Sequence, residues 1–220
     1  MAPSSQPPQE PARGLELRRF FYAIESDDGL AYDNSGFLKP DLVVDLLRPE
    51  DLLRFQCVLV TAPPWTGKTY VAKGIFNWLH RQGSAVIARG RVPESVRSAL
   101  TPLEDFVSGD SLEPPWWQEW TVDTTNGVWI VDALDEGYER ERGIPFKIVQ
   151  MIQSLSCAQR ERLRLIILSR DYDVVAVVQN ELQPLYEGQH DAYKRLVLAP
   201  LDRVEANNLV GPRRSINNVV

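Results

Sequence analysis

The sequence predicts an α/β fold in three layers, a mainly parallel, five-stranded sheet with helices on both of its faces. Short apolar runs alternate with segments of helical periodicity along the chain. This alternation is typical of repeated βαβ units, whose right-handed crossovers place successive strands in one parallel sheet. In addition, one apolar strand runs through a loop of small residues directly into a helix, which is the setting of a phosphate-binding loop.

The N-terminal part is expected to be a lead-in to the main domain. Residues 1–13 are rich in Pro, Ser and Gln, a composition that favours disorder. Residues 14–55 are expected to be largely helical, with one helix at 15–24 and a second around 42–47. Pro49 ends the second helical pattern.

The most informative motif starts at Cys57, where a short apolar strand enters a loop that closes on Gly67-Lys68-Thr69. The helical pattern after the loop has four apolar residues on one face, Val71, Ile75, Trp78 and Leu79. In a phosphate-binding loop, backbone N–H groups and a helix N-terminus surround phosphate oxygens. Lys68 is expected to reach the β- and γ-phosphates, and the Thr69 hydroxyl to ligate Mg²⁺. We therefore predict that the protein binds a nucleoside triphosphate.

The loop departs from the commonest form of this motif at its start. Ala62 stands in the place of the first glycine, and Pro63 and Pro64 have no N–H to donate. The prolines are expected to stiffen the loop without removing the main donors, which come from its later residues. Trp65 is expected to pack its ring over the loop, with stacking on a nucleotide base as the alternative. The candidate nucleotide-binding residues are Ala62, Pro63, Pro64, Trp65, Thr66, Gly67, Lys68, Thr69 and Tyr70.

The segment after this helix is predicted to begin with a strand at 85–88. Residues 90–126 contain several prolines and are expected to be irregular, with one or two short helices. Three tryptophans cluster here, Trp116, Trp117 and Trp120. We expect them to form a lid packed on the core, and a partner-binding surface is the alternative.

A third predicted strand, 128–131, delivers Asp132 at its carboxyl end. An apolar strand that ends in a carboxylate is the Walker B arrangement, in which Asp132 would hold Mg²⁺ through a water. Asp135 or Glu136, just past the strand, would orient or deprotonate the attacking water, and we prefer Glu136 for this role. The alternative is an acidic turn after a buried strand.

A fourth predicted strand, 165–168, leads to Arg170. Ligand sites form at the carboxyl ends of strands in open α/β sheets. Arg170 is therefore expected to contact the γ-phosphate and to report its presence. The alternative is a surface ion pair with Asp171 or Asp173.

The remaining elements complete the predicted domain. Helical periodicity predicts helices over 148–155 and 174–182, and a short fifth strand is predicted at 196–198. The main domain is expected to cover 56–210, followed by a tail at 211–220.

Composition limits the function classes. Hydrophobic residues make up 44% and charged residues 25%, which is normal for a soluble globular chain. A net charge of −6 argues against broad binding to nucleic acid or anionic membranes. Without a long apolar run or a signal peptide, we expect a cytoplasmic protein with no membrane partner. Cys57 and Cys157 fit no metal or redox spacing.

Three motifs resemble the Walker A, Walker B and sensor 1 elements of NACHT-type STAND NTPases. They are Gly67-Lys68-Thr69, Asp132-Ala-Leu-Asp135-Glu136 and Leu168-Ser169-Arg170. The acid pair after the Walker B aspartate separates this family from generic P-loop proteins. Membership would imply a P-loop NTPase fold with sheet order 5-1-4-3-2, and ATP, ADP and Mg²⁺ as ligands. It would also imply a switch that is held with ADP, exchanges it for ATP and self-associates, in immunity, cell death or anti-phage defence.

In this family the core normally continues into a helical domain and a winged-helix domain, and the sequence up to Val220 is too short to include them. We therefore expect a fragment, a shortened copy, or a subunit whose partner supplies the missing helical and sensor domains, with slow or absent hydrolysis in isolation. Two alternatives stay open. One is a scaffold on the same fold that needs no nucleotide and uses the tryptophan cluster as a partner surface. The other is a small-molecule kinase, since these also use P-loops.

Overall fold

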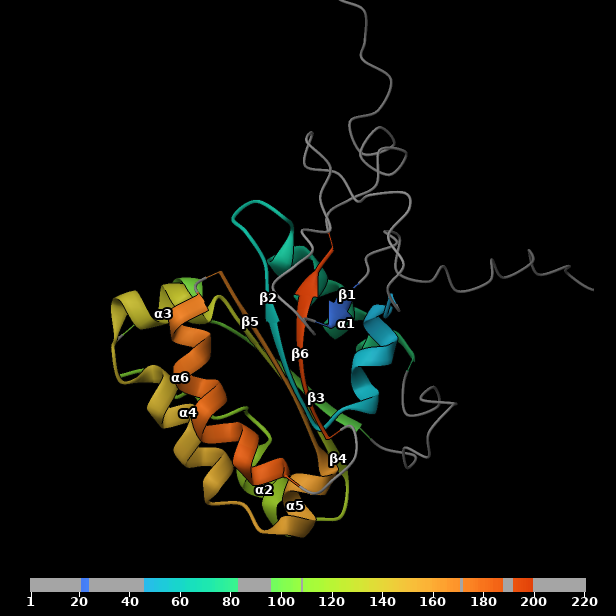
Figure 1. The fold of residues 1–220 in the computed structure, drawn as a ribbon. Coiled ribbons are helices and arrows are strands. Elements are labelled where there is room, and N and C mark those ends of the chain that lie inside the picture. Colours follow the sequence, from blue (N-terminus) through green and yellow to red (C-terminus); the bar gives the residue numbers. More distant parts are fainter. Residues whose placement is uncertain are drawn as a thin grey trace, which may run out of the picture.

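The computed structural model shows a six-stranded sheet with helices on both faces (Figure 1). It describes residues 21–23, 46–82, 96–107, 109–170, 172–187 and 192–199. The strands are β1 (Phe21–Ala23), β2 (Cys57–Thr61), β3 (Val96–Pro102), β4 (Asn126–Asp132), β5 (Leu163–Ser169) and β6 (Tyr193–Leu198). The helices are α1 (Lys68–Gln82), α2 (Trp117–Val122), α3 (Leu134–Arg140), α4 (Ile144–Gln153), α5 (Cys157–Arg162) and α6 (Tyr172–Leu182). Short 3-10 helices are η1 (Pro49–Arg54), η3 (Leu103–Asp105) and η4 (Gln183–Tyr186).

The strand order is β1-β6-β2-β5-β4-β3. All neighbours from β6 to β3 are parallel, and β1 adds an antiparallel strand beside β6. Counted in chain order, the five parallel strands run 5-1-4-3-2, so the predicted topology is confirmed. The chain therefore has an α/β fold of the P-loop NTPase type, with β5 inserted between β2 and β4.

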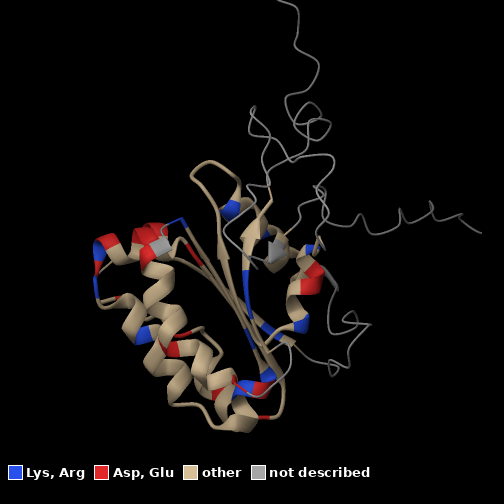
Figure 2. Cartoon of the chain, viewed as in Figure 1, with Lys and Arg blue, Asp and Glu red and all other residues tan. Residues whose placement is uncertain are grey.

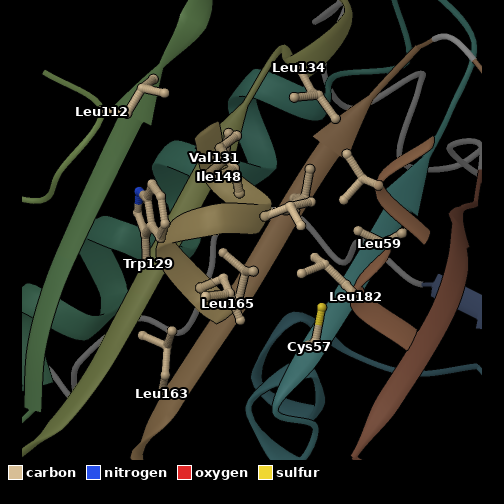
Figure 3. Close-up of a cluster of buried hydrophobic side chains, with 14 of the residues drawn as sticks. Cys57, Leu59, Leu112, Trp129, Val131, Leu134, Ile148, Leu163, Leu165 and Leu182 are labelled. Atoms are coloured by element: carbon tan, nitrogen blue, oxygen red, sulfur yellow. The ribbon is translucent and has the colours of Figure 1, made fainter. Parts of the chain in front are cut away.

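Residues of each central strand alternate between two hydrophobic clusters, one on each face of the sheet. In β2, Cys57 and Leu59 join the cluster under α2, α3, α4 and α6, which Figure 3 shows, while Val58 and Val60 join the cluster under α1 and η1. Strand side chains alternate between faces, so a strand covered on both faces is apolar throughout. This explains why β2, β4 and β5 were recognisable as short continuous apolar runs.

The tryptophan cluster packs on the core, as expected. Trp120 is fully buried and Trp117 nearly so, and the ring of Trp117 meets the buried Trp129 ring at 5.5 Å. The Trp120 indole donates a hydrogen bond to the Thr125 carbonyl at 2.9 Å. Trp116 is partly buried against the same cluster. Because these rings pack within the protein, the alternative of a tryptophan partner surface is wrong.

The segment expected to be irregular, 90–126, instead contains β3, the strand at the far edge of the parallel sheet. Its sequence, Val-Arg-Ser-Ala-Leu-Thr-Pro, mixes polar and apolar residues without a regular alternation, and only Ala99 is buried. As an edge strand, β3 is only partly buried on both faces, with Ala99 in one cluster and Val96 and Leu100 against the other, so it lacks the continuous apolar run of the central strands. The strand predicted at 85–88 lies outside the described residues.

The N-terminal prediction also needs correction. Residues 21–23, predicted to be helical, form β1 and pair with β6. Leu47, placed in the second predicted helix, forms an antiparallel bridge with Phe21. The Phe21 side chain is fully buried, so pairing and packing against the sheet override the local helical periodicity. Leu46 is also not helical. Residues 15–20, 24 and 42–45, the lead 1–13 and the tail 211–220 lie outside the described residues.

Among the described helices, none is both long and apolar enough to cross a membrane. The two helices predicted in the C-terminal half are present. α6 matches the predicted 174–182 closely, whereas α4 begins four residues before and ends two residues before the predicted 148–155. Both cover the face of the sheet that lies opposite α1 (Figure 1).

Candidate functional site

The sheet brings the three sequence motifs to one edge. β2, β5 and β4 are adjacent and parallel, with Thr61 beside Ser169 and Val131 beside Ile167. Their carboxyl ends therefore carry the loop 62–67, Arg170 and Asp132 side by side. The middles of these strands carry almost no charge, whereas acidic residues gather at α3, just past the end of β4 (Figure 2). A charged site thus lies at the edge where open α/β sheets bind their ligands.

The loop between β2 and α1 is tightly bent. Trp65 has a φ of 64° and Gly67 a φ of 87°, both in the left-handed region. Glycine adopts this region freely, whereas tryptophan is strained there. The Thr66 hydroxyl donates to the Pro63 carbonyl at 2.7 Å and closes the turn around Trp65. Such turns let successive N–H groups face one side, which is the geometry of an anion-binding nest.

Ala62 fits its place at the start of the loop. Its φ lies outside the left-handed region, so the methyl group causes no backbone strain where a glycine is more usual. The Ala62 amide donates to the Ser169 carbonyl at 3.2 Å, which fastens the start of the loop to β5.

Lys68, the first residue of α1, folds back onto the loop. Its ammonium donates to the carbonyls of Ala62 and Pro63 at 2.8 and 2.9 Å, and the side chain is buried. Burial lowers the pKa of Lys68 to about 8; Asp135 and Asp132 act against this shift, whereas Arg170 adds to it. In the part of the chain that the structure describes, this desolvated ammonium donates its hydrogen bonds to neutral carbonyl groups, and such a group can bind an anion favourably.

Asp132 is buried at the end of β4, with 1% of its surface exposed. Its Oδ1 accepts from the Ala133 amide at 3.0 Å, while Oδ2 is buried and has no hydrogen-bond partner among the described residues. Burial raises the pKa of Asp132, and the nearby Thr69 hydroxyl lowers it in part. Thr69 thus lies beside the carboxylate without satisfying Oδ2. The Thr69 hydroxyl and the unpaired Oδ2 of Asp132 are oxygen ligands of the kind that Mg²⁺ prefers, and Mg²⁺ or a water bound to it would give Oδ2 a partner.

The acid pair starts α3 and is held by Arg170 from the neighbouring strand. Asp135 Oδ1 accepts from the Arg170 amide at 2.9 Å and Oδ2 from Arg170 Nε at 2.7 Å. Arg170 Nη2 also pairs with Glu136 Oε1. The Ser169 hydroxyl approaches Asp135 Oδ1 at 3.4 Å. Arg170 therefore bridges β5 to both acids. Asp171, one of the two alternative partners considered from the sequence, lies outside the described residues.

Two further predicted residues lie outside this cluster of charges. Trp65 is 99% exposed, so the expected packing of its ring over the loop is wrong. Tyr70, in the first turn of α1, is 49% exposed. The structure thus brings together Lys68, Thr69, Asp132, Asp135, Glu136 and Arg170, and it leaves the two aromatic rings pointing outward.

Glu104, in η3, is a charged neighbour that the sequence analysis missed. It raises the pKa of Asp132 through like-charge repulsion and lies 3.9 Å from Lys73 of α1. Its position follows from β3, because Pro102 at the end of that strand is in register with Asp132. Only recognition of β3 as an edge strand could have placed Glu104 at this site.

No family model matches the chain, and neither does any curated protein. Among solved structures, it is similar to the Aeropyrum pernix ORC2 protein in its ADP form, with 16% identity and a TM-score of 0.43 over 82% of this chain. It is also similar to Cdc6p from Pyrobaculum aerophilum, with 9% identity and a TM-score of 0.36 over 63% of the chain and 38% of that protein. The chain spans 54% of the ORC2 structure. These similarities are weak, so the fold assignment rests on the strand order and on the loop between β2 and α1.

Proposed function

We propose that this protein is an ATP-binding, Mg²⁺-dependent P-loop NTPase core that works as a signalling switch of the NACHT type. One observation carries the proposal. Lys68, the pair Thr69 and Asp132, and Arg170 with its two acids come from three separate segments and meet at one sheet edge. Each group has the chemistry that a different part of a Mg²⁺–triphosphate requires.

The loop and Lys68 are assigned to the phosphates. To reach a phosphate oxygen, the Lys68 ammonium would exchange the carbonyls of Ala62 and Pro63 for a charged acceptor. That exchange is favourable because a charge-assisted bond is stronger than a bond to a neutral carbonyl. Thr69 and Asp132 would hold Mg²⁺, which neutralises charge on the β- and γ-phosphates when it is bound.

Asp135, Glu136 and Arg170 are assigned to hydrolysis and its control. In the present structure Arg170 engages both acids, so neither carboxylate is free to orient a water. A γ-phosphate would compete with the acids for the guanidinium and so release Glu136 to accept a proton from the attacking water. This arrangement supports slow or absent hydrolysis in the unswitched state.

Nucleotide-dependent stabilisation tests the proposal. Mg-ATP or Mg-ADP at 100 times its dissociation constant should raise the Tm by about 5–10 °C for a chain of this size. Lys68→Ala should abolish the shift, whereas Lys147→Ala should preserve it. Lys147 is a suitable control because it lies on α4, on the opposite face of the sheet from α1, and pairs there with Glu141. An unchanged Tm at millimolar nucleotide would contradict the proposal.

The switch itself is the finer part of the proposal and rests on the resemblance of the three motifs to NACHT proteins. We assign it to defence signalling in which ATP replaces ADP and promotes self-association or binding to a partner subunit. Light scattering of the purified chain with Mg-ADP and with Mg-ATP measures this directly. A larger mass with Mg-ATP supports the switch, and equal masses would leave a nucleotide-binding core without it.

A further inference from the structure

We propose that Trp65 stacks on the base of the bound nucleotide, so that the loop recognises a nucleoside as well as a polyphosphate. This inference rests on the proposed nucleotide site and extends it to a part of the ligand that no other described residue is assigned to contact. It starts from an unusual combination, a tryptophan that is both strained in its backbone and almost completely exposed.

The backbone at Trp65 would suit glycine better. Its φ of 64° lies in the left-handed region, where a bulky side chain is unfavourable. Its ring is 99% exposed and so gains nothing from packing within the protein. Strained residues persist where function requires them, and an observed outlier of this kind points to a functional role.

Hydrogen bonds on either side of Trp65 brace the backbone that carries the ring. The Pro63 carbonyl accepts from the Thr66 hydroxyl at 2.7 Å and from the Lys68 ammonium at 2.9 Å. Trp65 lies between these anchors and follows Pro64, whose ring restricts the backbone. The indole is therefore attached to the same short, braced turn as the group assigned to the phosphates.

The chemistry of this surface favours a base over a protein partner. Among the described residues, Tyr70 in the first turn of α1 is the other exposed aromatic residue beside the loop, and the remaining large exposed apolar residues are on different elements. The latter are Val107, Val122, Phe146 and Val177. Stable protein interfaces bury areas far larger than two rings, whereas one aromatic ring is enough to stack on a base.

The test compares ATP with inorganic tripolyphosphate, both with Mg²⁺, by calorimetry on the purified chain. Trp65→Gly should lower the ratio of ATP affinity to tripolyphosphate affinity by about tenfold, which is the contribution of one stacked base. Trp65→Phe should retain most of the ratio, since it keeps an aromatic ring. Glycine adopts the left-handed region freely, so Trp65→Gly preserves the turn. Phe146→Ala removes an exposed ring on α4 and serves as the matched control.

The outcomes separate the two proposals. If the wild-type chain binds neither ATP nor tripolyphosphate, the proposed function fails and the stacking role fails with it. If both ligands bind and Trp65→Gly leaves the ratio unchanged, the stacking role alone is overturned. It is equally overturned if Trp65→Gly leaves the ratio intact but abolishes self-association in light scattering, because the ring would then contact a second copy.

Discussion

The two halves of the site differ in how firmly the protein holds them. The loop half, residues 62–70, presents exposed residues and two left-handed backbone positions. The acid half, Asp132–Glu136 with Ser169–Arg170, is largely buried and tied together by an ion-paired arginine. Asp132 and Asp135 are 1% and 7% exposed, in contrast to 99% for Trp65. The acid half is thus already organised, whereas in the loop half the proposed phosphate binding would require Lys68 to exchange its carbonyl partners.

Loss of one charged partner should lower the free energy of unfolding more in the acid half than in the loop half. Arg170→Ala would leave Asp135 buried and without its cation, and we expect a loss of about 2–3 kcal/mol in the free energy of unfolding. This figure is below that of a fully buried pair because the Arg170 side chain is 35% exposed and partly screened by solvent. Urea denaturation measures the loss.

A double-mutant cycle sharpens this prediction. Asp135→Asn in the Arg170→Ala background removes the unpaired charge and should recover part of the lost stability. Lys147→Ala, which breaks a more exposed ion pair with Glu141, should cost less than about 1 kcal/mol. Equal losses for Arg170→Ala and Lys147→Ala would contradict the view that the acid half is held mainly by Arg170.

The loop half should respond to pH. The pKa of Lys68 is lowered to about 8, chiefly by burial, and the protonated form is the one assigned to phosphate binding. ATP affinity should therefore be nearly constant up to about pH 7, fall about twofold by pH 8 and fall by up to about tenfold by pH 9. Calorimetry at pH 7, 8 and 9 measures the change. Affinity that is flat across this range would separate phosphate binding from the charge of Lys68.

The stability of the unliganded protein should follow the opposite trend. Between the lowered pKa of about 8 and the ordinary lysine value of 10.5, the folded state holds fewer protons on Lys68 than the unfolded state. The contribution of Lys68 to stability therefore rises with pH in this window. Comparison with Lys68→Met, which lacks the titrating group, isolates this contribution in urea denaturation.

The sequence predicted the central part of the fold, and its local motifs named the charged residues that the structure brings together at one sheet edge. β2, β4 and β5 are covered on both faces, so their apolar runs are continuous. β1 and β3 are edge strands whose pairing depends on distant partners, and both were missed. The ion pairs of Arg170 with Asp135 and Glu136 could not be predicted for the same reason. These acids lie 35 and 34 residues before Arg170 along the chain, and the strand order brings them together.

The backbone of the loop half can be tested at Gly67. With φ at 87°, Gly67→Ala would force a methyl group into the left-handed region and should cost about 1–2 kcal/mol. The same change should weaken ATP binding, because the loop amides would shift. Thermal unfolding with and without Mg-ATP measures both effects. Retained affinity with lowered stability would show that the exact loop backbone is not needed for the ligand.

The acid half has its own left-handed residue, and it gives the smallest effect. Ala133, between Asp132 and α3, has a φ of 58°. Ala133→Gly would relieve the left-handed strain of about 1 kcal/mol but increase the conformational entropy of the unfolded chain by a similar amount. We expect a net stabilisation of no more than about 0.5 kcal/mol by urea denaturation. A marked destabilisation would instead mean that the Ala133 methyl group, which is buried, contributes packing that offsets its backbone strain.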